Sequence, residues 1–199
     1  MVDRAFYFRY TVDMIHEGTK TKQTFRAADV AFIGIAAAII AVCSWVSIPT
    51  AVPFTLQTFA VFASLLILGG KNGFFAVLTY LLLGAVGVPV FAGFKGGLAA
   101  LLGNTGGYLL GFLLLAAVYW LITALAGEKL YIQILALSAG LLVCYAFGTA
   151  WFMMLYIKTN GPVSLLTVLG WCVFPFLLPD AVKMALALLL SKKIKLPNK

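Results

Sequence analysis

The stretch VAFIGIAAAIIAVCSWVSIPTAVPFTLQTFAVFASLLILGG, residues 30–70, contains no Asp, Glu, Lys or Arg. A helix that crosses the hydrocarbon core of a bilayer needs about 20 apolar residues, so this stretch is too long for one span and long enough for two. Pro49 and Pro53 divide it, because proline lacks a backbone N–H and favours extended backbone in the residue before it. We therefore predict two helices joined by an irregular segment at about 48–54.

The composition of the whole chain points the same way. Of its 199 residues 63% are hydrophobic and 10% are charged, and the mean hydropathy is +1.07. Soluble domains are about 45–50% apolar and about 25% charged. Lipid-facing backbone must satisfy its own hydrogen bonds, which leaves helices or a closed barrel. A barrel would alternate apolar and polar residues in strands of about 10 residues, whereas apolar residues here run without interruption. An all-α integral membrane protein is predicted.

Turn-forming segments separate the remaining helices. The sequences GGKNG at 69–73 and KTNGP at 158–162 are typical of turns, and a glycine-rich segment at about 87–103 predicts irregular backbone that must be shielded from lipid. The last helix is expected to kink at Pro175 or Pro179. The six predicted transmembrane helices cover about 27–48, 54–69, 72–86, 105–126, 130–157 and 163–194.

The Lys and Arg residues between the helices predict the topology. Counted from Lys20 onward and including those that flank the first and last helix, nine cations lie on the cytoplasmic side when both termini are in the cytoplasm, and two, Lys95 and Lys158, lie on the other side. Cytoplasmic loops carry an excess of Lys and Arg, so an N-in, C-in arrangement is predicted. It places both irregular segments, 48–54 and 87–103, on the extracytoplasmic side. The expected organisation is a cytosolic tail (1–26), a six-helix membrane domain (27–194) and a second cytosolic tail (195–199).

Several classes of function are disfavoured. The net charge of +8 is scattered between apolar segments and builds no basic stripe, so no nucleic-acid partner is expected. His16 is the only histidine and lies outside the predicted spans, which argues against a histidine-based hydrolase or a metalloenzyme. A phosphate-binding loop is also missing, because Leu65 and Asn72 stand where its first glycine and its hydroxyl residue would be. We expect no enzymatic activity, no metal and no cofactor.

Asp180 and Lys183 are the main candidates for ligand contacts. Charged residues inside a span cost about 2.5–3.5 kcal/mol each, and a spacing of three places these two on one helix face. One interpretation is a structural ion pair that merely tolerates burial. The other is the polar floor of a pocket, in which a carboxylate accepts N–H groups and an ammonium meets a ligand oxygen.

A second polar cluster is GNTGGY, residues 103–108. Asn104 or Thr105 is a good candidate for a helix N-cap; alternatively, the glycines let backbone approach a ligand to which these side chains offer hydrogen bonds. Gln57 at the start of the second helix can join them. The full set of predicted substrate-binding residues is Asp180, Lys183, Asn104, Thr105, Gly106, Tyr108, Gln57, Phe91 and Tyr80, the aromatic members serving either as pocket walls or as ordinary packing residues.

Three stretches together carry a more specific pattern. They are IPTAVPFTLQT (48–58), YLLLGAVGVPVFA (80–92) with its continuation to 109, and PDAVK (179–183). They resemble the BioY family, the biotin-specific substrate-binding (S) subunits of energy-coupling-factor (ECF) transporters, over about residues 28–190. The family usually reads GPTGGY where Asn104 here replaces the proline, so Asn104 is either a variant ligand contact or a cap.

The resemblance implies a six-helix subunit of a prokaryotic plasma membrane that captures biotin for ATP-driven uptake. It implies that Asp180 accepts the ureido N–H groups, that Lys183 donates to the ureido oxygen or to the carboxylate, and that a transmembrane coupling subunit and two ATPases are partners. Docking is expected near the small residues Ala37 and Ala41. The alternatives are an S subunit for another vitamin and a non-transporting membrane scaffold.

Overall fold

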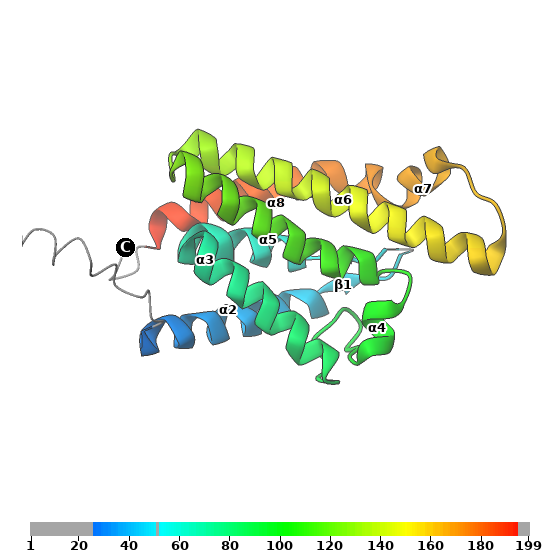
Figure 1. Cartoon of the computed structure of the whole chain (residues 1–199), viewed down its shortest axis with the longest axis horizontal. Helices are drawn as coiled ribbons and strands as arrows, with labels where there is room; N and C mark the ends of the chain where they lie inside the picture. The colour runs from blue at the N-terminus through cyan, green and yellow to red at the C-terminus, as the bar shows by residue number, and fades with distance from the viewer. Residues whose placement is uncertain (1–25, 51, 195–199) are drawn as a thin grey trace, which may run out of the picture. The chain divides into compact units, whose positions relative to one another are not determined.

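The computed structural model of the protein describes residues 26–50 and 52–194. The two predicted tails therefore lie, apart from Arg26, outside the described residues. The contacts described below join residues of the compact unit that begins at Ala31. In chain order the elements are α2 (Ala27–Trp45), β1 (Ser47–Ile48), β2 (Phe54–Thr55), α3 (Gln57–Ala85), α4 (Leu98–Leu102), α5 (Gly106–Ala126), α6 (Leu130–Asn160), α7 (Leu165–Cys172) and α8 (Phe174–Lys193) (Figure 1).

Among the described residues, five helical stretches are long and apolar enough to cross a membrane. One of them, α3, is two helices that meet at Gly69, where φ is 83° and ψ is 168°. A Cβ added to Gly73 would lie 2.8 Å from Leu65 Cα, although residues eight apart in a straight helix are separated by about 12 Å. The chain therefore folds back at Gly69, inside the predicted turn. This break accounts for the sixth helix and confirms the predicted fold class.

Helices α5 and α6 run side by side in opposite directions (Figure 1). They approach closely because each helix has a glycine at the point where it touches the other helix. A Cβ on Gly111 of α5 would lie 2.8 Å from Cys144 Sγ, and a Cβ on Gly140 of α6 would lie 2.8 Å from Leu115 O. Small residues at such contacts are the usual means of helix association in membranes.

The predicted last helix is divided into α7 and α8 at Val173, where φ is −127° and ψ is −57°. The break lies two residues before Pro175, one of the two predicted kink sites. Proline cannot donate a backbone hydrogen bond, and its ring clashes with the carbonyl four residues earlier. Pro175 therefore occupies the first turn of α8, where no intrahelical N–H is needed, whereas Pro179 lies inside the helix.

The segments predicted as irregular contain short regular structure. The segment at about 48–54 joins β1 to β2 in an antiparallel pair, with Ser47 opposite Thr55 and Ile48 opposite Phe54. The segment at about 87–103 contains α4. The strand pair and the short helix both provide hydrogen-bond partners for backbone N–H and C=O groups, which lipid cannot provide.

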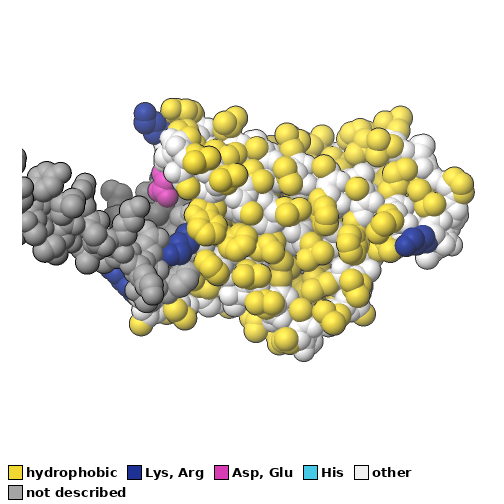
Figure 2. Space-filling view, viewed as in Figure 1, with side chains coloured by type: hydrophobic (Ala, Val, Ile, Leu, Met, Phe, Trp, Pro, Cys, Tyr) yellow, Lys and Arg dark blue, Asp and Glu magenta, His cyan; other side chains and the backbone are white. Residues whose placement is uncertain are grey.

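Apolar side chains dominate the surface of the described residues. Figure 2 shows hydrophobic side chains spread over the visible face and a few charged side chains near its margins. Leu125 is 80% exposed and Leu178 is 76% exposed. Apolar surface of this extent is suited to lipid rather than to water, as expected for a multi-pass membrane protein.

Candidate ligand-binding site

A cavity of about 610 Å³ lies among the hairpin of β1 and β2, the segment after α3, and helices α3, α5, α6 and α8. Small-molecule sites commonly have volumes of about 300–1,000 Å³. The cavity is therefore large enough for a ligand of vitamin size. Its lining draws on residues from 50 to 183, so that most of the fold contributes to it.

A buried network of three side chains forms the most polar part of the cavity. Lys183 Nζ donates to Asp180 Oδ1 at 2.7 Å, and Tyr145 OH donates to Asp180 Oδ2 at 2.6 Å. Asp180 is 2% exposed and Lys183 is 5% exposed. The pair is electrically neutral, and each carboxylate oxygen keeps a lone pair for a further donor. The network can therefore accept hydrogen bonds from an uncharged polar ligand group.

The Lys183 ammonium also lies over an aromatic ring. Nζ lies 4.4 Å from the centroid of the Phe54 ring, a distance at which a cation is attracted to the face of the ring. Phe54 in turn stacks on Phe176, with centroids 5.8 Å apart. Residues of β2 and α8 thus fix the position of the ammonium from two sides.

Gln57, the first residue of α3, contributes a buried amide to the lining. Its side chain is 3% exposed, and its Nε2 has no hydrogen-bond partner among the described residues. A buried donor without a partner costs about 1–3 kcal/mol. This amide is suited to a ligand that supplies a carbonyl oxygen.

The segment that follows α3 is held against the end of α2. Ser44 Oγ lies 2.5 Å from Val90 O, and Trp45 Nε1 donates to Pro89 O at 2.9 Å. The Trp45 ring also stacks on Phe94, with centroids 5.0 Å apart. These contacts hold one side of the cavity in place.

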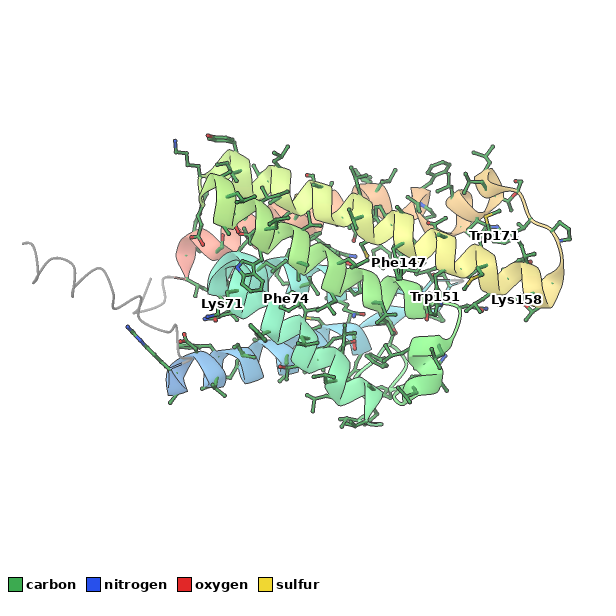
Figure 3. All side chains as sticks on the ribbon, in the orientation of Figure 1. Lys71, Phe74, Phe147, Trp151, Lys158 and Trp171 are labelled. Carbon is green, nitrogen blue, oxygen red and sulfur yellow. The ribbon has the colours of Figure 1, made fainter. Side chains whose placement is uncertain are left out.

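The start of α5 forms another side. Figure 3 shows Trp151 next to Phe147 on α6, and Trp151 Nε1 donates to Gly103 O at 3.1 Å. Tyr108 OH and Thr149 Oγ1 are 3.0 Å apart. Thr105 occupies the N-cap position of α5, but its side chain makes no capping hydrogen bond. The Thr105 hydroxyl is therefore not used to cap the helix.

Comparison with known proteins assigns the chain to a family. The family model described as "BioY family" matches residues 18–197, which is most of the chain. This chain belongs to the BioY family.

Named members of the BioY family cover most of the chain. The Biotin transporter BioY of Thermotoga maritima is 43% identical over 163 residues, which are 81% of this chain and 92% of that protein. The Probable biotin transporter BioY of Pyrococcus horikoshii is 37% identical over 171 residues, which are 85% of this chain and 98% of that protein.

A solved structure has the same fold. The S-component for biotin from an ECF-type ABC transporter superposes with a TM-score of 0.72, over 85% of this chain and 94% of that one. The two sequences are 23% identical. The fold of this BioY chain is therefore that of an ECF S component.

Most of the predicted site residues meet at the cavity of this BioY chain. Its lining includes seven of the nine, namely Gln57, Phe91, Asn104, Thr105, Tyr108, Asp180 and Lys183. Gly106 and Tyr80 are not in the lining. A Cβ on Gly106 would lie 1.7 Å from Leu101 O, and Tyr80 packs edge-on against Phe91 at 5.5 Å. Tyr80 therefore lies behind a lining residue, and a binding role for any of the nine stays a prediction.

The small residues predicted to dock a partner lie on the inner face of α2. Ala37 is 1% exposed and Ala41 is 5% exposed, so neither reaches the surface of this chain. The outer face of α2 carries another small pair four residues apart, Gly34 and Ala38, and a Cβ on Gly34 would meet open space. Docking at Ala37 and Ala41 thus stays an untested prediction for which the burial gives no support.

Tyr145 is one of the polar lining residues that the sequence-based prediction missed. It lies in the middle of α6, 35 residues from Asp180 in sequence. A tyrosine in an apolar span was the available signal, because a buried hydroxyl usually finds a hydrogen-bond partner. The sequence did not indicate which partner, because the pairing depends on how α6 packs on α8.

Proposed function

We propose that this chain is the biotin-binding membrane subunit of an ECF-type uptake transporter. The observation that carries the proposal is the buried Tyr145–Asp180–Lys183 network inside a cavity of vitamin size. Family membership supports the same ligand, because named relatives are biotin transporters.

The chemistry of biotin suits these groups. Its ureido ring offers two N–H donors and one carbonyl oxygen, and its thioether ring is apolar. Asp180 accepts ureido N–H groups, while Lys183 Nζ and the unpartnered Gln57 Nε2 donate to the carbonyl oxygen. Phe91 and Tyr108 supply apolar wall for the ring system. Binding in this mode involves no bond breaking, so the chain performs no catalysis and uses biotin as cargo, not as a cofactor.

Energy for uptake comes from partner subunits in this proposal. A transmembrane coupling subunit meets the outer face of α2 beside Gly34 and Ala38, and two ATPases complete the complex. Both termini lie in the cytoplasm of a prokaryotic cell, and the cavity opens on the opposite side of the plasma membrane.

Biotin binding by the purified protein tests the proposal. The chain in detergent is expected to bind biotin at nanomolar concentration, measured by calorimetry or by retention of labelled biotin. Binding of another vitamin in place of biotin would assign a different cargo to the same cavity. No binding by any vitamin would contradict the proposal and favour a membrane scaffold with a structural Asp180–Lys183 pair.

A further inference from the structure

The ammonium of Lys183 has hydrogen-bonding capacity that this chain does not use. It can donate three hydrogen bonds, and among the described residues Asp180 Oδ1 is the one acceptor within hydrogen-bond distance, at 2.7 Å. Lys183 is 5% exposed, so water has little access to the remaining donors. The side chain also contributes to the cavity lining. A ligand in the cavity can therefore use a donor that the protein leaves free.

The ring of Phe54 attracts this ammonium without changing the charge of the site. Nζ lies 4.4 Å from the ring centroid, where the negative face of an aromatic ring attracts a cation. A second carboxylate in that place would also attract the ammonium, but it would give the neutral Asp180–Lys183 pair a net negative charge. An aromatic ring avoids this effect, because it has no net charge.

The structure also fixes the ring itself. Phe54 belongs to the paired strand β2, and its ring stacks on Phe176 of α8, with centroids 5.8 Å apart and an interplanar angle of 28°. Its chain neighbours Pro53 and Thr55 line the cavity, whereas Phe54 is not in the lining. Any effect of the Phe54 ring on a ligand is therefore expected to act through Lys183.

We propose that Phe54 is a positioning residue for cargo binding, in which the electron-rich face of its ring holds the Lys183 ammonium where it meets a polar group of the cargo. This inference rests on the proposed function and adds to it a residue that does not touch the cargo. Lysine has a long, flexible side chain, and ordering it on binding costs conformational entropy. A ring that restricts the ammonium beforehand removes part of that cost.

Fluorinated phenylalanines separate the attraction of the ring from its packing. Fluorine withdraws electron density from the ring face, which weakens the attraction for a cation, while the ring keeps nearly the same shape. Mono-, di- and trifluorinated phenylalanine are placed at position 54 of the full chain by nonsense suppression. The biotin dissociation constant is expected to rise step by step, to about tenfold for the trifluorinated ring. Calorimetric titration in detergent measures this constant, and thermal unfolding checks that each variant is folded.

Phe152 on α6 provides the matched control. Its ring is also stacked on one aromatic ring, that of Tyr156, with centroids 5.8 Å apart. Phe152 is not in the cavity lining, and no cation of the described residues lies over its ring. The same fluorinated series at position 152 should leave biotin binding unchanged.

A conventional substitution gives a second test at position 54. Phe54→Leu keeps an apolar side chain but removes the ring, so it should weaken biotin binding at least as much as the trifluorinated ring does. Unchanged binding by Phe54→Leu would overturn the inference.

Two outcomes of the fluorinated series would also overturn it. A dissociation constant that does not depend on the number of fluorines at position 54 would make Phe54 an ordinary packing residue. Equal rises at positions 54 and 152 would show a general effect of fluorine on the protein. If the unmodified protein does not bind biotin, the proposed function fails and this inference fails with it. If the protein binds biotin and the series at position 54 is flat, only the role of Phe54 fails.

Discussion

At the residue scale, the informative feature is a carboxylate with two donors in the middle of an apolar protein. One carboxylate oxygen of Asp180 accepts a hydrogen bond from Tyr145, and the other accepts one from Lys183. Apolar residues of similar volume would be at least as stable at these positions. We therefore predict that the network serves ligand binding rather than stability alone.

Single and double substitutions at Asp180 and Lys183 separate these two explanations. Asp180→Asn and Lys183→Met, made separately, are each expected to weaken biotin binding by about 2–5 kcal/mol, the range for removing one member of a buried charged contact. The folded protein should persist, because six packed helices do not depend on one pair. Calorimetric titration and thermal unfolding in detergent provide the two measurements.

The double variant is the decisive control. If the pair is structural, each single change leaves a buried charge without its partner and lowers the melting temperature, and combining Asp180→Asn with Lys183→Met restores both stability and biotin binding. Recovered binding in the double variant would remove both residues from the set of ligand contacts.

The sequence predicted Asp180 and Lys183 as ligand contacts because charged residues are rare in transmembrane helices. It did not predict Tyr145 or the proximity of Lys95 to the cavity. Both depend on how separate segments pack, which no local pattern encodes. The hydroxyl of Tyr145 reaches Asp180 from another helix, and the turn that carries Lys95 is closed by backbone hydrogen bonds to Phe91.

At the element scale, glycine determines how closely helices approach. Gly111 on α5 leaves no room for a side chain against Cys144, whereas Gly34 on α2 faces open space. Both glycines lie inside helices, so a substitution changes helix propensity by a similar amount at either site. They form a matched pair for testing packing.

Gly111→Leu is expected to destabilise the protein by about 1–3 kcal/mol, the usual cost of overpacking. Gly34→Leu should not destabilise it, because a side chain there meets open space and leucine favours a helix more than glycine does, by at most about 1 kcal/mol. Thermal unfolding in detergent, with and without biotin, measures both. Equal melting temperatures for the two variants would contradict the close contact between α5 and α6.

Helix boundaries were predictable where backbone chemistry is local. Gly69 and the prolines at 49 and 53 marked real breaks, and Pro175 marked one to within two residues. The inner face of α2 was not predictable, because Ala36, Ala37, Ala38 and Ala41 surround the helix with similar small side chains. In lipid neither face is distinguished by polarity, so the sequence did not indicate that Ala37 and Ala41 face the interior of this chain.

At the scale of the whole molecule, the charges outside the spans lie toward different ends of the helices. Figure 3 shows Lys71 near the break in α3 and Lys158 near the far end of α6. The start of α5, whose residues contribute to the cavity, lies toward the same end of the molecule as the last residues of α6 (Figure 1). This arrangement is compatible with the predicted N-in, C-in topology, which remains to be tested.

Cysteine labelling of intact cells tests that topology. Asn160→Cys is expected to react with a membrane-impermeant maleimide from outside, and Lys129→Cys only after permeabilisation, because Lys and Arg accumulate on the cytoplasmic side. Wild-type protein gives the background from Cys43, Cys144 and Cys172. The opposite labelling pattern would invert the protein and place the cavity on the cytoplasmic side.

The break at Gly69 also affects the surrounding lipid. The first half of α3, residues 57–68, rises at most about 18 Å, whereas the hydrocarbon core is about 30 Å thick. We expect the hairpin before it, with Ile48 62% exposed, to occupy part of the remaining depth. We expect the adjacent leaflet to be thinned where the hairpin lies. Under the proposed function, the cargo would then lie below the average level of the headgroups while still in contact with water, and the thickness of the host membrane would affect binding.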